Sequence, residues 1–308
     1  MIIKYGTQNT QIDITPTVYT RCMKSSIIYI PSDDNKRATL FTDPLYGILK
    51  SIFIDANEYK ADTPIYIDTV SNTVYTENVP PHIAEIYPEA VLASLHKKLV
   101  IRHGSFRDEF SEQKMAVRFL RESDKVLEIG GNIGRNSLII ASIVQDSLVT
   151  LESDPGIARQ LEENRDANGM RFAIEASALS LRPLIQKGWD TVVSDVVLDG
   201  YKKVPTITLD QLRKKYAIPF TALVLDCEGA FYYILQDMPE ILDGIHTILM
   251  ENDYRTVSHK EYIDSTLRQK GFTCVYTEAL GSEYAFLNFP CQSNFFEAWR
   301  LETLPKIE

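Results

Sequence analysis

Residues 126–134 read Val126-Leu127-Glu128-Ile129-Gly130-Gly131-Asn132-Ile133-Gly134, and an apolar segment begins near Asn136. The first four residues have the continuous apolar character of a buried strand, and the glycines that follow indicate a tight turn into a helix. Outward from this stretch, Val149–Glu152 predicts the next strand and Ile157–Asn168 the next helix. Strands that alternate with helices favour a mostly parallel sheet with helices on both faces.

The spacing of the glycine-rich turn distinguishes between two classes of cofactor. Dinucleotide-binding turns have the pattern G-x-G-x-x-G, in which the backbone approaches a pyrophosphate at the helix N-terminus. Here the pattern is Glu128-x-Gly130-x-Asn132-x-Gly134, and the acid at its start would repel a pyrophosphate. The same acid suits a ligand that carries an ammonium group and a sulfonium, which describes S-adenosylmethionine. A purely structural turn between strand and helix is the alternative interpretation.

A second acid supports the same cofactor. Glu152 follows Glu128 by 24 residues and ends the second predicted strand. A carboxylate there can accept hydrogen bonds from both ribose hydroxyls of the cofactor. We expect the adenine to lie beside the backbone near residues 176–178. The predicted cofactor-binding residues are Glu128, Gly130, Gly131, Asn132, Gly134, Asn136, Glu152, Ser153, Ala176, Ser177 and Asp226.

Acidic residues also follow the later strands. Asp226 and Glu228 lie where the fourth predicted strand ends, and Glu251 lies where the fifth ends. The carboxyl ends of strands in an open α/β sheet border the crevice where ligands bind. Methyl transfer to an alcohol requires that the hydroxyl lose its proton, which a carboxylate can accept. Asp226, Glu228 and Glu251 are therefore the predicted catalytic residues, with helix capping as the alternative role of Glu228.

The chain from about residue 105 to 290 resembles the FkbM family of class I methyltransferases. Seven segments in the same order carry the resemblance: Val126–Gly134, Leu151–Pro155, Leu161–Asn164 with Asn168, Ala178–Ser180, Thr208–Leu212, Leu225–Gly229 and Leu249–Glu251. The resemblance implies an α/β, Rossmann-like class I methyltransferase fold with a seven-stranded, mostly parallel sheet whose last strand is antiparallel. It also implies O-methyl transfer to a hydroxyl of a sugar, glycan or glycosylated small molecule, with a nucleotide-sugar among the candidate acceptors.

Four positions depart from the pattern of that family. Gly131 stands where the family usually has alanine, and Glu128 where it usually has aspartate. Phe231 stands where a second glutamate is common, and Leu181 where aspartate is frequent. The first two changes are mild and concern the cofactor, whereas the last two concern the acceptor side of the site.

A metal ion is an alternative use of the acidic residues. Asp226, Glu251 and Asn252 resemble the oxygen ligands of magnesium-dependent O-methyltransferases, and a hard cation prefers such ligands. We favour a site without metal, and Mg²⁺ bound by these three residues is the alternative.

Residues 1–90 predict a separate small domain with a linker, followed by a methyltransferase domain over residues 91–308. Runs such as Ile27–Ile30 and Ile52–Ile54 are separated by Asp, Asn, Pro and Ser clusters, which favours a β-rich or α+β unit. The segment is similar to amino-terminal extensions on methyltransferase-like proteins of large DNA viruses. At the other end, Phe272–Thr277 and Tyr284–Phe289 predict a hairpin.

The composition is that of a folded acidic protein. Of the 308 residues 44% are hydrophobic, and 32 Lys and Arg against 42 Asp and Glu give a formal net charge of −10. Such a charge argues against general binding to nucleic acid or to anionic membranes. Four scattered cysteines, the absence of a secretory signal and the lack of a membrane-spanning run favour a cytoplasmic location, in the host if the protein is viral. The expected partner is a small-molecule or glycan acceptor, and a second copy of the chain, in a homodimer, is another.

Two other classes of function stay open. An NAD-dependent oxidoreductase would also use a glycine-rich turn, although the pattern from Glu128 to Gly134 argues against a dinucleotide. A non-catalytic, methyltransferase-like binding or scaffold protein could recruit a partner through its amino-terminal unit. The intact glycine turn together with Glu152 argues against an inactive site.

Overall fold

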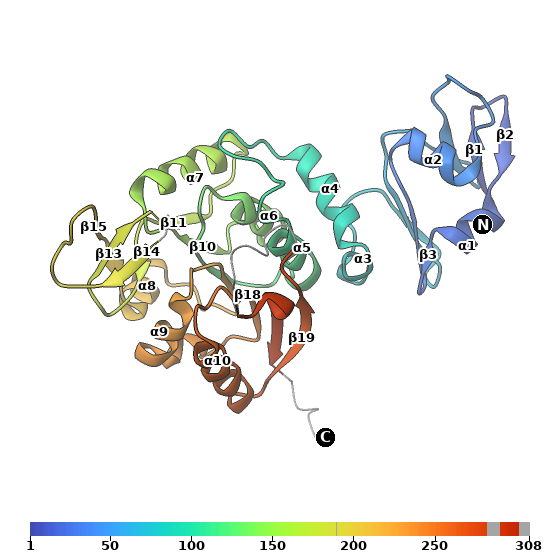
Figure 1. The fold of residues 1–308 in the computed structure, drawn as a ribbon. Coiled ribbons are helices and arrows are strands. Elements are labelled where there is room, and N and C mark those ends of the chain that lie inside the picture. Colours follow the sequence, from blue (N-terminus) through green and yellow to red (C-terminus); the bar gives the residue numbers. More distant parts are fainter. Residues whose placement is uncertain (189, 282–289, 302–308) are drawn as a thin grey trace. The chain divides into compact units, whose positions relative to one another are not determined.

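The computed structural model describes residues 1–188, 190–281 and 290–301 (Figure 1). The chain divides into two compact units, Met1–Ser94 and Leu95–Glu308. The division falls within helix α4 (Pro88–Lys98), shortly after the predicted boundary at residue 90. Each unit has a buried apolar core of its own.

The amino-terminal unit contains two antiparallel four-stranded sheets, with the orders β2-β1-β5-β6 and β3-β4-β7-β8. Their strands are β1 (Ile3–Gly6), β2 (Gln11–Asp13), β3 (Met23–Lys24), β4 (Ile27–Ile30), β5 (Ser51–Ile54), β6 (Asn57–Tyr59), β7 (Ile65–Asp68) and β8 (Thr73–Tyr75). Alternate isoleucines of β4, β5 and β7 pack into one core, as the period of two in a half-buried strand requires. The predicted β-rich unit is confirmed.

A buried arginine fixes helix α2 (Asp34–Phe41) to this unit, which also contains α1 (Thr15–Arg21) and α3 (Pro81–Ile86). Arg37 is fully buried, and its guanidinium donates to the carbonyl oxygens of Pro31, Lys60 and Thr63 at 2.7, 3.1 and 2.7 Å. Because a buried cation without partners is costly, these three bonds determine which face α2 turns to the core.

The second unit is built on a seven-stranded sheet with the order β11-β10-β9-β17-β18-β20-β19. The strands are β9 (Val126–Ile129), β10 (Leu148–Leu151), β11 (Ala173–Glu175), β17 (Ala222–Leu225), β18 (Thr247–Glu251), β19 (Phe272–Glu278) and β20 (Phe296–Leu301). β20 is antiparallel to both of its neighbours, and the pairs from β11 to β18 are parallel. This arrangement confirms the predicted Rossmann-like class I methyltransferase fold.

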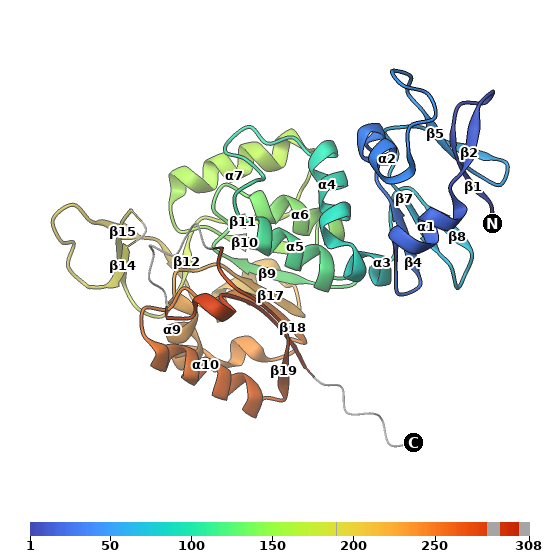
Figure 2. The same cartoon turned by 45° about the vertical axis from the view of Figure 1, so that its right-hand side comes forward.

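Helices cover both faces of the sheet, as Figure 2 shows. One side of the sheet is covered by α5 (Phe110–Phe119), α6 (Arg135–Val144) and α7 (Pro155–Ala167). The other side is covered by α9 (Ala230–Asp237) and α10 (Val257–Gln269). Helix α8 (Leu209–Tyr216) packs into the same hydrophobic core as α9 and α10. The central strands β9, β10 and β17 are buried along their whole length, because neither face of the sheet meets solvent there.

Only the first strand of the predicted carboxyl-terminal hairpin lies among the described residues. β19 (Phe272–Glu278) pairs with β20 (Phe296–Leu301), whereas the proposed partner Tyr284–Phe289 lies outside the described residues. β20, which sequence analysis missed, inserts between β18 and β19 in the sheet. The short helical turns η1 (Pro239–Leu242) and η3 (Gln292–Asn294) connect elements in this half.

The chain between two short paired strands, β12 (Ala178–Leu179) and β16 (Thr206–Ile207), forms an insertion beside the seven-stranded sheet. β12 pairs in parallel with β16, and between them β13 (Leu184–Lys187), β14 (Asp190–Val193) and β15 (Lys202–Val204) form an antiparallel three-stranded sheet. Sequence analysis missed this sheet, since its strands have only three or four residues each. Among the helices of the described residues, none has the length and apolar character needed to cross a membrane.

Candidate functional site

The glycine turn after β9 passes unusually close to the end of β17. Gly130 has φ +94°, and a Cβ built on it would lie 1.5 Å from the backbone oxygen of Asp226. The two strands are held in register here, because the Asp226 N–H donates to the Ile129 carbonyl at 3.0 Å. A side chain at residue 130 is therefore excluded by the protein's own backbone, in addition to the unfavourable φ.

A cavity of about 640 Å³ opens at the carboxyl ends of the central strands. The ends of β9, β10 and β17, the start of β12, the insertion and α9 supply its walls, and all of the lining residues fall between 129 and 238. Six of the predicted cofactor-binding residues line it: Gly130, Asn132, Glu152, Ser153, Ser177 and Asp226. A volume of this size suits a cofactor or a small-molecule ligand.

The other predicted cofactor residues lie outside the cavity lining. Glu128 is buried behind the glycine turn, where the Ser137 hydroxyl donates to its carboxylate. The side chain of Asn136 is also buried, and its Oδ1 has no hydrogen-bond partner among the described residues. Ala176 is exposed, so at this edge the neighbouring Ser177 and Ala178 form the wall instead.

Two further glycines of the turn, Gly131 and Gly134, allow neighbouring side chains to pack against it. A Cβ on Gly131 would lie 2.2 Å from Thr150 Oγ1 and 2.9 Å from Leu161 Cδ1, and one on Gly134 would lie 3.1 Å from Leu161 Cγ. The side chains of β10 and α7 thus fill the space that the alanine common in the FkbM family would need at residue 131. These two glycines shape the turn without facing the cavity.

Glu152 joins the glycine turn to the end of β10 and also faces the cavity. Its Oε2 accepts from the Asn132 N–H at 2.9 Å, and its Oε1 accepts from the Asp154 N–H at 2.8 Å. The side chain is 7% exposed, and burial raises the pKa of its carboxyl. The acid predicted from sequence therefore has a fixed position at the cavity.

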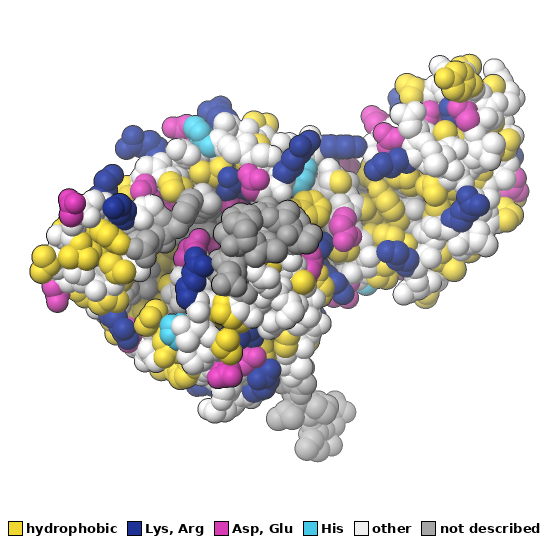
Figure 3. Space-filling view, viewed as in Figure 1, with side chains coloured by type: hydrophobic (Ala, Val, Ile, Leu, Met, Phe, Trp, Pro, Cys, Tyr) yellow, Lys and Arg dark blue, Asp and Glu magenta, His cyan; other side chains and the backbone are white. Residues whose placement is uncertain are grey.

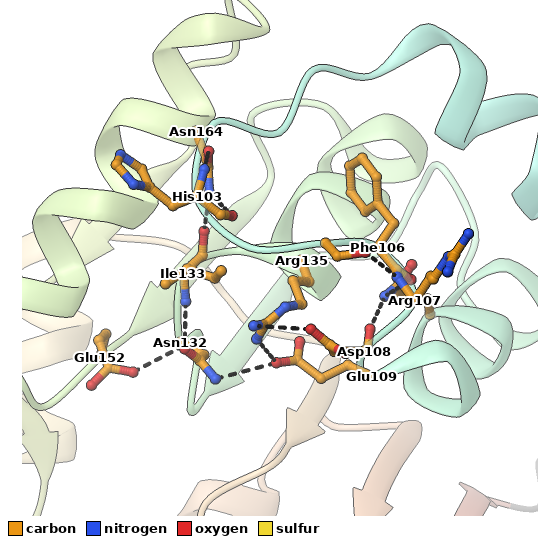
Figure 4. A network of polar contacts seen from close by, with 12 residues as sticks. His103, Phe106, Arg107, Asp108, Glu109, Asn132, Ile133, Arg135, Glu152 and Asn164 are labelled. Carbon is orange, nitrogen blue, oxygen red and sulfur yellow. Dashed lines mark hydrogen bonds and ion pairs between the residues drawn. The ribbon is translucent and has the colours of Figure 1, made fainter. Parts of the chain in front are cut away.

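A network behind the turn holds it against the segment that precedes α5 (Figure 4). Glu109 Oε1 accepts from Arg135 Nη1 at 2.6 Å and from Asn132 Nδ2 at 3.2 Å. Asn164 of α7 donates to the Ile133 carbonyl at 2.8 Å and accepts from the N–H of His103 at 3.0 Å. Sequence analysis missed Glu109 and Arg135, because no motif relates positions so far apart in the chain.

Three carboxyl groups meet beside the cavity. Oxygen atoms of Glu112 on α5, Asp226 after β17 and Glu251 at the end of β18 all lie within 4.8 Å of one another. Asp226 also lines the cavity, whereas Glu251 does not. Sequence analysis missed Glu112, although a signal existed: it lies three and seven residues before Met115 and Phe119, on the buried face of α5.

Burial and mutual repulsion favour protonation of this acidic group. The pKa of Asp226 is raised well above its usual range by burial and by Glu112, Glu109, Asp253 and Glu228. The pKa of Glu251 is raised in the same way, by burial and by Asp226 and Glu112. Burial also raises the pKa of Glu109 and of Asp253 to about 7. The group therefore carries fewer negative charges at neutral pH than its composition suggests.

Asn252 lies apart from the three carboxyl groups. It is fully buried, and its Nδ2 donates to the Asn294 carbonyl at 2.7 Å, which turns the amide toward η3. Its Oδ1 has no partner among the described residues. In the metal alternative, Glu112 therefore takes the place that sequence analysis gave to Asn252.

The outer wall of the cavity carries a different set of polar groups. Glu228 is exposed, has φ +52°, and its pKa is raised by burial and lowered by Arg255. Arg182 forms a bidentate pair with Asp237, at 2.6 and 2.7 Å, and its guanidinium lies 5.3 Å from the centre of the Tyr233 ring. Phe231, which stands where the FkbM family commonly has glutamate, is buried in the core.

Comparison with known proteins gives distant structural similarity only. No family model matches the chain, and no curated protein matches it. An O-methyltransferase from Bacillus cereus in complex with S-adenosylhomocysteine is 12% identical, with a TM-score of 0.39 over 73% of this chain and 93% of that chain. An rRNA methylase from Streptococcus thermophilus is 12% identical, with a TM-score of 0.39 over 63% and 95%. The strand order assigns the fold, and the resemblance to the FkbM family stays a prediction.

The buried Glu128 predicts a pH-dependent stability. Burial raises its pKa from 4.5 to about 7, so the folded state binds more protons than the unfolded state between these values. The free energy of unfolding should therefore fall as the pH rises through this window, by roughly 3 kcal/mol relative to Glu128→Gln. Urea unfolding followed by tryptophan fluorescence measures this difference, because Trp299 is buried in the second unit.

The matched control for this experiment is Glu122→Gln, which removes an exposed carboxyl next to the same strand. It should follow the wild type at every pH. Parallel curves for the wild type and Glu128→Gln would contradict the prediction.

We expect the group of Glu112, Asp226 and Glu251 to bind no divalent cation, because burial and mutual repulsion raise the pKa of Asp226 and of Glu251 and so favour protons at this place. Thermal unfolding in MgCl₂ and in EDTA should then give the same Tm. A cation at about 100 times its Kd would stabilise the fold by about 2.7 kcal/mol and raise Tm by roughly 5 °C. Such a rise in the wild type, absent from Glu112→Gln, would establish the metal alternative instead.

Proposed function

We propose that the unit of residues 95–308 transfers a methyl group from S-adenosylmethionine. The observation that carries the proposal is the position of Glu152, whose carboxylate lines the cavity while two backbone N–H groups hold it in place. A carboxylate has about four acceptor positions, so two remain for the ribose hydroxyls of the cofactor. The resemblance to class I methyltransferases implies a cofactor over this same edge of the sheet.

The charge of the cavity favours S-adenosylmethionine over NAD. Glu152 and Glu228 line it, and Arg182, the one cation among its lining residues, is already paired with Asp237. The pyrophosphate of a dinucleotide would thus meet carboxylates without a free cation, whereas a sulfonium and an ammonium are attracted. When bound, S-adenosylmethionine supplies an electrophilic methyl group.

We infer that the acceptor is a hydroxyl of a sugar, glycan or glycosylated small molecule. Beyond the glycine turn, the cavity wall offers carboxylates together with the exposed Tyr233 and the guanidinium of Arg182, all of which can hydrogen-bond hydroxyl groups. The phosphates of a nucleotide-sugar or a nucleic acid would be repelled by the carboxylates of Glu152 and Glu228. An uncharged acceptor is therefore favoured over a nucleotide-sugar.

The two acids at the end of β17 have different roles in this proposal. Asp226 is partly buried among other acids, which keeps its carboxyl protonated, so it orients the acceptor or the cofactor by donating a hydrogen bond. Glu228 is more exposed; burial raises the pKa of its carboxyl, which makes it a stronger base, and Arg255 opposes this rise, so we assign it the role of accepting the hydroxyl proton. Glu251 acts through Asp226, because it does not line the cavity.

A pair of alanines tests the cofactor assignment. Ala178 lines the cavity where we expect the adenine, whereas Ala176 is exposed and lies outside the lining. Ala178→Phe should abolish binding of S-adenosylhomocysteine in calorimetry, because the ring fills the adenine position. Ala176→Phe should bind within about threefold of the wild type, and circular dichroism should show that both variants are folded.

Two results would contradict the cofactor assignment. One is equal affinity for S-adenosylhomocysteine in both alanine variants. The other is binding of NAD to the wild type with S-adenosylhomocysteine unbound, which would support the oxidoreductase alternative. Binding without methyl transfer to any acceptor would support the scaffold alternative.

A second pair of variants tests the chemistry. Glu228→Gln should lower methyl transfer by roughly a hundredfold or more while leaving the affinity for S-adenosylhomocysteine within about threefold, because a general base acts in the chemical step. Asp226→Asn should have a much smaller effect on the rate, since the aspartyl group is already protonated. The measurement is transfer of a tritiated methyl group to a panel of methyl glycosides and oligosaccharides.

The control is Glu261→Gln on α10, which removes an exposed carboxyl outside the cavity. It should retain full activity. Near-wild-type turnover in Glu228→Gln would show that alignment of the reactants carries the reaction without a base at this position.

A further inference from the structure

The amino-terminal unit contains a second cavity, of about 550 Å³, formed entirely by its own residues. It lies between the end of α1, strands β3 and β4, and one face of α2. Its lining residues are Arg21, Cys22, Lys24, Tyr29, Pro31, Asn35, Lys36, Thr39, Leu40 and Tyr87. The structure describes all of residues 1–94, so this wall is complete.

The charge of this cavity is opposite to that of the unit around it. Residues 1–94 contain seven Lys and Arg against eleven Asp and Glu. Two of the seven, Arg37 and Lys50, are buried and bonded inside the fold, so five remain at the surface. Three of these five line the cavity, and no Asp or Glu does. Such a concentration of positive charge in an acidic unit indicates an anionic ligand.

The three cations are available for that ligand. Within residues 1–94, Arg21, Lys24 and Lys36 form no ion pair; Arg21 only donates to the Leu40 carbonyl at 3.4 Å, and Lys24 Nζ lies 5.4 Å from the centre of the Tyr87 ring. Lys36, Thr39 and Leu40 share one face of α2 because they are three and four residues apart. The buried Arg37 holds that face in place from the other side of the helix.

Aromatic rings form another part of the wall. Tyr29 is partly buried, and its ring packs against Tyr66 and Tyr87, with centroids 5.1 and 5.4 Å away. Tyr87 is fixed by its hydroxyl, which donates to the Cys22 and Ile27 carbonyls at 3.0 and 3.2 Å. Tyrosine rings that are held rigidly beside Lys and Arg provide a stacking surface for a nucleobase next to its phosphates.

We propose that this cavity binds a nucleoside phosphate, with the phosphates on Arg21, Lys24 and Lys36 and the base against Tyr29. A single nucleotide fits a cavity of this volume. The unit as a whole has more acids than bases, so it repels a long polyanion, and a free nucleotide is favoured over a nucleotide within an RNA strand. This proposal is independent of the methyltransferase function.

The test is calorimetry on the full chain with ADP, inorganic pyrophosphate, adenosine and a 5′-phosphorylated hexaribonucleotide. Saturating S-adenosylhomocysteine is present, so that a nucleotide cannot bind in the acidic cavity unnoticed. ADP should bind at least tenfold more tightly than pyrophosphate or adenosine, because each of these lacks one half of the ligand. ADP should also bind more tightly than the RNA.

Matched variants locate the site. Lys24→Gln/Lys36→Gln should weaken ADP binding at least about thirtyfold, since two charge-assisted contacts to phosphate are lost. Lys4→Gln/Lys60→Gln removes the same charge from exposed positions outside the cavity and should change the affinity by no more than about twofold. Tyr29→Leu should weaken binding about tenfold, and Tyr29→Phe should restore it, because stacking needs the ring and not the hydroxyl.

Four results would overturn the proposal. They are the absence of ADP binding at millimolar concentration, equal losses in the two lysine pairs, pyrophosphate binding as tight as that of ADP, and RNA binding tighter than that of ADP. The last result would assign the cavity to a nucleic-acid strand.

Discussion

The close approach of Gly130 to the backbone oxygen of Asp226 is the constraint on which the rest of the second unit depends. It brings the turn after β9 and the end of β17 into contact, so that the glycine turn, Glu152 and the acids after β17 border one cavity. Glu152 then fixes the turn from the β10 side, and Glu109 with Arg135 fixes it from behind (Figure 4). The missing side chain of Gly130 thus makes room for the neighbouring strand.

Desolvation explains why so many acids can gather around this turn. Glu128, Asp226 and Glu251 each lose hydration on folding, and burial is the largest cause of the raised pKa of each. A protonated carboxyl costs far less free energy to bury than a carboxylate, so protonation allows the acids to lie together in the fold. Burial raises the pKa of Glu228 as well, but this side chain is more exposed and Arg255 opposes the rise, which makes it the candidate to accept a proton.

Much of the fold could be predicted because it follows from local patterns. The apolar run before Gly130 and the alternation of strands and helices gave the parallel sheet, and six of eleven cofactor residues line the cavity. The rest depended on contacts between distant segments. Glu128 and Gly134 belong to the motif, but the Ser137 hydroxyl and Leu161 turn them inward. Glu112 and the strand β20 (Phe296–Leu301) enter the structure through tertiary packing that no local pattern records.

Charge separates the two cavities of the chain more sharply than shape does. The two differ little in volume, at about 640 and 550 Å³, and both have aromatic side chains in the wall. In the larger cavity Arg182 is neutralised by Asp237 while Glu152 and Glu228 line the wall, which favours cationic or uncharged ligands. In the smaller one Lys24 and Lys36 have no acid beside them in the wall (Figure 3 shows the charged side chains of one face). A phosphorylated ligand is thus attracted to one cavity and repelled by the other.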